Sequence, residues 1–147
     1  MPNHPGPEKT DWTTPEELEQ LMGRRLVPGD IIQLTMRTTY GRFLIPGCYH
    51  VAVCVDNERN FAHVAKRPDT CLVLQENIQV FRGRQCRLNN RPPLPPWRRL
   101  SVEEMLSRVR RMLGSVFDYN VIRRNCESFI NWCCFGEWFS AQSEQAR

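Results

Sequence analysis

The sequence lacks the features that mark membrane-spanning and secreted proteins. Its 147 residues contain no apolar run that approaches the roughly 18 residues of a transmembrane helix. Residues 1–10 contain no apolar core of a secretion signal. The 7 cysteines are an odd number without a framework spacing, so we expect reduced thiols and a cytoplasmic location.

Motifs for metals, nucleotides and serine hydrolysis are also missing. The chain has no Cys-x-x-Cys pair and no two histidines four residues apart, and adjacent Cys133 and Cys134 would point about 100° apart around a helix. It has no phosphate-binding loop, no Gly-rich dinucleotide turn and no Gly-x-Ser-x-Gly elbow. A net charge of +4 favours an anionic lipid surface but is too small for a nucleic-acid footprint. We therefore expect no metal, no cofactor and no nucleic-acid partner.

What the sequence does contain is the pattern of one α+β domain. Proline and glycine make residues 1–11 a flexible tail, and residues 12–147 fit a single domain. Thr13 or Thr14 is expected to cap a helix that starts at Pro15 and ends at Gly23. Apolar alternation predicts strands, some of them short, over residues 31–36, 49–55, 61–65, 72–74, 78–81 and 85–88, with a loop over residues 37–47.

Two helices are expected after a Pro-rich connector over residues 89–99. A capping box at Ser101 starts the first helix, and apolar residues keep helical spacing up to Gly114. Asn125 is the expected cap of the second helix, which begins at Cys126 and ends at the next glycine. The order of helix, strands and two more helices predicts an antiparallel sheet packed against helices.

Histidine is scarce, and two of the 3 histidines lie on neighbouring predicted strands. A two-residue hairpin loop over residues 57–58 would place Ala52 opposite His63. His50 would then be one diagonal step away on the same face, roughly 7–8 Å from His63 at the backbone, so the two imidazoles would nearly touch. A register slip by one residue would send them to opposite faces. The alternative is two ordinary core or surface histidines.

Cys126 is the cysteine expected at the start of a helix. The N–H groups and partial positive charge of a helix N-terminus favour a thiolate, so we expect the pKa of this thiol to fall well below about 8.5. The same N–H groups can hold a developing oxyanion. The alternative is a small buried apolar side chain, which is the usual role of a free cysteine.

Short motifs in a particular order carry a resemblance to a known family. They are Pro28-Gly29-Asp30-Ile31-Ile32, Tyr49-His50-Val51-Ala52-Val53, Phe61-Ala62-His63-Val64-Ala65, Pro92-Pro93-Leu94-Pro95 and Asn125-Cys126-Glu127-Ser128-Phe129. With these motifs, residues 27–146 resemble the lecithin:retinol acyltransferase family. The most similar members are its phospholipase A/acyltransferase group, the H-Ras-like suppressor proteins.

The resemblance implies a permuted papain-like fold and acyl transfer through a thioester. Cys126 would be the nucleophile at a helix N-terminus, His50 the general base and then acid, and His63 the residue that orients His50. The substrate would be a glycerophospholipid, and the activity that of a phospholipase A1/A2 and O- or N-acyltransferase. Water, an amine or a lysolipid would accept the acyl group.

The chain departs from the family pattern near these residues. Val51 and Cys54 stand where an aromatic residue and a tyrosine are usual, and Ser128 stands where a histidine is usual. These changes motivate an alternative: a catalytically weak or inactive relative with an interaction or regulatory role, as in viral proteins with the same histidine-box and Asn-Cys pattern. A cysteine peptidase or amidase is a further alternative, because a Cys-His-His arrangement also cleaves amides.

Contact with membranes is expected either through a C-terminal anchor that this sequence does not include, or peripherally. Many members of the group carry a hydrophobic C-terminal anchor, whereas this sequence ends at Arg147 without one. Trp138, Phe139 and nearby arginines are the candidates for contact with a lipid surface.

Overall fold

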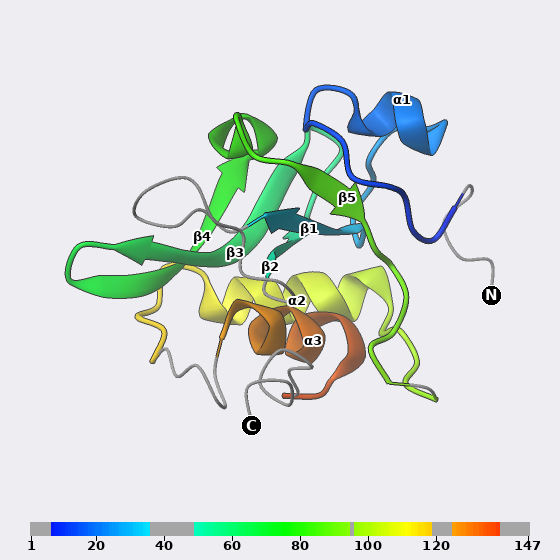
Figure 1. Cartoon of the computed structure of the whole chain (residues 1–147). Helices are drawn as coiled ribbons and strands as arrows, with labels where there is room; N and C mark the ends of the chain where they lie inside the picture. Colours follow the sequence, from blue (N-terminus) through cyan, green and yellow to red (C-terminus); the bar gives the residue numbers. More distant parts are fainter. Residues whose placement is uncertain (1–6, 36–48, 95, 119–124, 139–147) are drawn as a thin grey trace.

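The computed structural model describes residues 7–35, 49–94, 96–118 and 125–138. The elements in chain order are α1 (Leu18–Met22), β1 (Ile31–Thr35), β2 (Tyr49–Cys54), β3 (Asn60–Arg67), β4 (Thr70–Asn77), the 3₁₀ helix η1 (Ile78–Phe81), β5 (Cys86–Leu88), α2 (Val102–Met112) and α3 (Cys126–Phe135). The strands form one antiparallel sheet in the order β4-β3-β2-β1-β5 (Figure 1). The loop predicted over residues 37–47 lies outside the described residues.

Both faces of the sheet are apolar, and each face is covered. The helices α2 and α3 lie side by side against one face (Figure 1), where Phe129 and Ile130 pack on Val51 and Val53. The other face forms a second cluster with α1 and η1, which includes Phe81. The predicted α+β class, with an antiparallel sheet packed against helices, is therefore confirmed.

The strands follow the predicted alternation but differ in length. The ladder between β3 and β4 runs from Asn60↔Asn77 to Arg67↔Thr70, well beyond the strands predicted over residues 61–65 and 72–74. The prediction of a strand over residues 78–81 is wrong, because these residues form η1. The Asn77 side chain accepts a hydrogen bond from the backbone N–H of Gln79 at 3.2 Å, which starts a helical turn instead of continuing the strand.

The first helix begins later than predicted. Its N-cap is Glu17, which makes no side-chain capping hydrogen bond. Thr13, one of the two predicted caps, instead exchanges two backbone hydrogen bonds of 2.8 Å with Cys86. The N–H of Thr10 also donates to a backbone carbonyl of β5 at 3.0 Å. Part of the segment expected to be a flexible tail is therefore held along β5, where an edge strand offers free backbone groups.

Both predicted C-terminal helices are present with their predicted caps. The Ser101 hydroxyl accepts a hydrogen bond from the N–H of Glu104 at 3.1 Å. Asn125 Oδ1 accepts from the N–H of Ser128 at 3.0 Å, and Ser128 Oγ accepts from the N–H of Asn125 at 2.8 Å. This reciprocal capping box fixes where α3 begins. Gly136 has a φ of 82° and ends α3.

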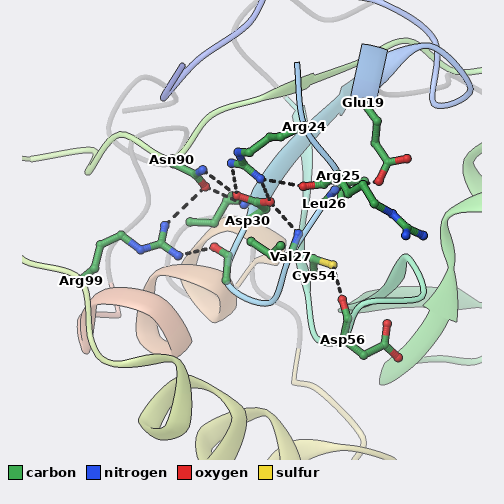
Figure 2. Close-up of polar contacts among 12 residues, drawn as sticks. Glu19, Arg24, Arg25, Leu26, Val27, Asp30, Cys54, Asp56, Asn90 and Arg99 are labelled. Atoms are coloured by element: carbon green, nitrogen blue, oxygen red, sulfur yellow. Dashed lines mark hydrogen bonds and ion pairs between the residues drawn. The ribbon is translucent and has the colours of Figure 1, made fainter. Parts of the chain in front are cut away.

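An ion pair in the segment before β1 is hydrogen-bonded to the Pro-rich connector (Figure 2). Asp30 is fully buried and accepts hydrogen bonds of 2.7 and 2.8 Å from the Arg24 guanidinium. It also accepts from the N–H of Val27 and the side-chain amide of Asn90, both at 2.9 Å. Burial alone would raise the pKa of Asp30, but these hydrogen bonds hold the pKa below its ordinary value.

Candidate active site

The strands β2 and β3 are paired only near the turn that joins them. Their ladder consists of two pairs, of which Val53↔Ala62 is the farther from the turn. β2 still pairs with β1 as far as Tyr49, and β3 pairs with β4 as far as Arg67. His50 therefore lies on a part of β2 beyond the end of the β2–β3 ladder.

The β2–β3 hairpin has the register that a two-residue loop predicts. The observed pairs place Ala52 level with His63, so His50 is one diagonal step away on the same face. The turn carries no strong hairpin dipeptide, but Asp56 Oδ1 accepts a hydrogen bond from the N–H of Glu58 at 2.8 Å. This side-chain contact stabilises the turn and hence the register.

The imidazoles of His50 and His63 are in direct contact. His50 Nε2 lies 2.7 Å from His63 Nδ1, and the ring planes are 82° apart. Phe81 packs on both rings, with centroid distances of 6.1 and 5.2 Å. Burial is the main cause that holds the pKa of His63 below, and that of His50 well below, the ordinary value. Both rings are therefore neutral at pH 7.

Glu76 on β4 is a residue of this site that the sequence analysis missed. Its Oε1 lies 2.9 Å from His63 Nε2 and 3.5 Å from the Arg67 guanidinium. Glu76 pairs with Phe61 in the β3–β4 register, so it is one diagonal step from His63 on the same face. Extending the alternation of the predicted strand over residues 72–74 by two residues is the signal that would have found it.

Cys126 reaches the same cavity from the other side of the sheet. Its Sγ lies 3.5 Å from the backbone carbonyl oxygen of Tyr49, the residue before His50. Cys126, His50 and His63 all line one cavity of about 450 Å³. Val64, which belongs to the cluster under α3, lines it too. The cavity therefore takes side chains from both faces of the sheet, next to the end of the β2–β3 ladder.

The expectation that the pKa of Cys126 falls is wrong. Burial raises the pKa of this thiol to about 11, because only 5% of the residue is exposed. Backbone N–H groups of Val51, Glu127 and Cys126 itself act in the opposite direction. The predicted effect of the helix N-terminus is thus present but smaller than the cost of desolvating the thiolate. The resting thiol is protonated and needs a base.

Three basic residues of the described part of the chain line the cavity. Lys66 and Arg67 at the end of β3, and Arg84 after η1, contribute to its lining. After burial, positive charge on Arg84 is a further cause of the lowered pKa of both histidines. Among the residues that the structure describes, no group of three His, Cys, Asp or Glu side chains is placed to hold a metal ion.

Comparison with known proteins identifies a family for the chain. The family model described as Lecithin retinol acyltransferase matches residues 25–139. No curated protein is significantly similar to the chain. The matched span covers most of the chain and includes Cys126, His50 and His63, the three residues singled out from the sequence.

Proposed function

The chain belongs to the lecithin retinol acyltransferase family, and we propose that it is a thiol phospholipase A1/A2 and O- or N-acyltransferase that acts on glycerophospholipids. Family membership indicates acyl transfer on lipid substrates. The phospholipase A/acyltransferase group and the permuted papain-like arrangement of the fold are parts of the proposal. The observation that supports it most strongly is the single cavity that the Cys126 thiol and the His50–His63 pair both line.

The first half of the proposed reaction forms an acyl thioester. The Cys126 sulfur attacks the ester carbonyl carbon while neutral His50 takes the thiol proton. The N–H groups at the start of α3 stabilise the oxyanion of the tetrahedral intermediate. The bond from the carbonyl carbon to the glycerol oxygen then breaks. His50 returns the proton to that oxygen, and the lysophospholipid leaves.

The second half transfers the acyl group to an acceptor. Water, an amine or a lysolipid attacks the thioester carbonyl while His50 takes its proton. The C–S bond breaks, and the proton passes from His50 to the sulfur. Hydrolysis and acyl transfer thus share one intermediate and differ only in the acceptor, so ping-pong kinetics are expected.

The basic residues in the lining of the cavity support a substrate that contains phosphate. Lys66, Arg67 and Arg84 present positive charge beside the imidazole pair. Guanidinium and ammonium groups are the usual protein partners of phosphate oxygens. A glycerophospholipid carries a phosphodiester a few bonds from its ester carbonyls, so both groups can occupy one cavity of this size.

We also propose peripheral contact with a membrane through the surface around Trp138. Trp138 is 39% exposed and stacks on Trp132 with a centroid distance of 5.2 Å. The Arg108 guanidinium lies 4.8 Å from the centroid of the Trp132 ring. Tryptophan and arginine favour the lipid–water interface. Phe139 lies outside the described residues, and across those residues no helix is long and apolar enough to cross a bilayer.

An acyl adduct on Cys126 is the direct test of the proposed activity. Incubation with a phosphatidylcholine labelled in its acyl chains should add one acyl mass to the peptide that contains Cys126, detected by mass spectrometry. The adduct should be absent in Cys126→Ala. Phospholipid cleavage by Cys126→Ala at the wild-type rate would overturn the proposal.

A non-catalytic relative with a regulatory role is the second candidate. The observation in its favour is the buried, protonated Cys126 thiol, because a nucleophile has to be deprotonated and reached by its substrate. A folded protein that forms no acyl adduct would favour this candidate. A binding partner that is retained equally well by Cys126→Ser would strengthen it.

A further inference from the structure

We propose that Glu76 is a positioning residue that sets the tautomers of both histidines and leaves Nδ1 of His50 as the proton acceptor. The tautomers follow from contacts within the chain. The catalytic consequence rests on the proposed function, because only an enzyme uses His50 as a base. Glu76 acts through His63.

The three side chains form a line of two hydrogen bonds. Glu76 Oε1 lies 2.9 Å from His63 Nε2, and His63 Nδ1 lies 2.7 Å from His50 Nε2. Both ring nitrogens of His63 are therefore used. The residue is 5% exposed, so solvent does not compete strongly for them.

The hydrogen positions are assigned from these contacts. Glu76 forms an ion pair with the Arg67 guanidinium at 3.5 Å, and a carboxylate only accepts hydrogen bonds. His63 must therefore carry its hydrogen on Nε2. Because His63 is neutral, its Nδ1 has a free lone pair and accepts from Nε2–H of His50. His50 is neutral as well, so its own Nδ1 is unprotonated.

The opposite tautomers would remove the base. A hydrogen on Nδ1 of His63 would donate to Nε2 of His50, and neutral His50 would then carry its hydrogen on Nδ1. That nitrogen could not accept the Cys126 proton. The carboxylate of Glu76 excludes this arrangement because it cannot donate to His63.

The positive charges around His50 and His63 disfavour protonation of these rings, and the carboxylate of Glu76 counteracts this effect. Lys66, Arg67 and Arg84 line the cavity, and among the described residues that line it Glu76 is the acidic one. After burial, Arg84 is a cause that lowers the pKa of both histidines, and Arg67 is one that lowers the pKa of His63. Glu76 acts in the opposite direction and raises the pKa of His63. It is thus placed to stabilise the positive charge that His50 gains when it takes the thiol proton.

The test compares Glu76→Gln with the wild-type chain and with Glu58→Gln. Glu58 is an exposed carboxylate in the β2–β3 turn and serves as the matched control. Long-range ¹H–¹⁵N spectra of the imidazoles at pH 7 distinguish protonated from unprotonated ring nitrogens. Wild type and Glu58→Gln should have both Nδ1 atoms unprotonated. Glu76→Gln should populate the reversed tautomers, because an amide can donate as well as accept.

Kinetics on phosphatidylcholine vesicles give the second readout. Glu76→Gln should lower kcat about 10–100-fold, less than the roughly 10⁴-fold loss when the orienting carboxylate of a Ser-His-Asp triad is replaced, because Glu76 acts on His50 only through His63. KM should change little, and Glu76→Asp, which keeps the carboxylate, should recover part of kcat. Thermal unfolding of each variant separates these effects from a loss of folded protein.

The tautomers test the positioning role of Glu76, and turnover of phospholipid tests the proposed function. Unchanged tautomers in folded Glu76→Gln would overturn the positioning role, even if activity fell. A tautomer reversal in a chain whose wild type turns over no phospholipid would support the positioning role and overturn the proposed function. A reversal together with a lowered kcat supports both.

Discussion

His50 Nε2 lies 2.7 Å from His63 Nδ1 on a part of the sheet where the two strands that carry these residues no longer pair. The backbone ladder ends at Val53↔Ala62, and the imidazoles bridge the strands beyond it. Side chains thus replace backbone hydrogen bonds at this point, and the cavity that opens there is lined by Cys126.

The histidines should differ in how much activity they contribute. His50→Ala removes the proposed base and should lower kcat/KM for phosphatidylcholine about 10²–10⁴-fold. His63→Asn removes the orienting ring and should cost less, about 10–100-fold. His4→Ala is the control, since His4 lies in the N-terminal residues outside the described part of the chain. Equal losses for all three variants would contradict the assignment.

The acid limb of the pH profile should lie below pH 6.5. Burial, the positive charge that His63 carries when it is protonated, and the charge on Arg84 lower the pKa of His50, so this base stays unprotonated at more acidic pH than an ordinary histidine. Arg84→Gln removes one of these causes and should move the limb to higher pH. The measurement is kcat/KM against pH for both proteins. A wild-type limb above pH 7 would contradict the pKa direction.

Without substrate, Cys126 should react slowly with alkylating reagents at neutral pH. Its pKa is raised by burial to about 11, so below that value the thiolate fraction grows about tenfold per pH unit. Iodoacetamide labelling of the Cys126 peptide, quantified by mass spectrometry, should rise steadily from pH 7 to pH 10. The chain unfolded in guanidinium is the control and should level off near the ordinary thiol value. A plateau below pH 8 in the folded chain would refute the raised pKa.

Asp30→Asn should destabilise the protein by about 3 kcal/mol, because it removes the buried carboxylate that pairs with the largely covered Arg24 guanidinium. Chemical denaturation measures the change. The control is Glu104→Gln, which removes a partly exposed ion pair with Arg108 and should cost at most about 0.5 kcal/mol. The folded-state pKa of Asp30 is lowered, so its stabilisation is present above the ordinary value of 3.8 and is lost as the pH falls through the lowered pKa. Equal costs for both variants would show that the ion pair contributes little.

Trp138→Ala should weaken binding to vesicles that contain anionic lipid. The loss of its apolar surface should reduce affinity about tenfold, which corresponds to about 1.4 kcal/mol. Co-sedimentation measures the bound fraction. Leu94→Ala is the matched control, because Leu94 is 41% exposed, close to the 39% of Trp138. A comparable loss in the control would argue against a specific surface around Trp138.

Local sequence patterns predicted where the two histidines and Cys126 lie in the fold, because these positions depend on strand alternation, a short loop and a helix cap. Alternation with period two and a short loop fix the face and register of His50 and His63. The capping box between Asn125 and Ser128 fixes the start of α3, and with it the place of Cys126. Ser128, a departure from the usual family pattern, has a clear structural role in that cap.

The contact between Glu76 and His63 and the pKa of Cys126 depend on tertiary structure, so local sequence patterns could not predict them. Glu76 meets His63 because the β3–β4 hairpin is long, and its length depends on packing against the rest of the sheet. The helix N-terminus correctly predicts the direction in which its N–H groups act on Cys126. The net direction of the pKa shift depends on how deeply the folded chain buries the sulfur, which a local sequence pattern does not predict.

Because the cavity takes side chains from both faces of the sheet, the proposed activity should depend strongly on how closely α3 packs against the sheet. The imidazoles belong to one layer and the sulfur to the other, and each layer has its own apolar cluster. A molecule in which α3 moved away from the sheet would keep its strands, its circular dichroism and its paired imidazoles, but the proposed nucleophile Cys126 would leave the cavity. Inactivation should therefore precede unfolding whenever the helical layer loosens first.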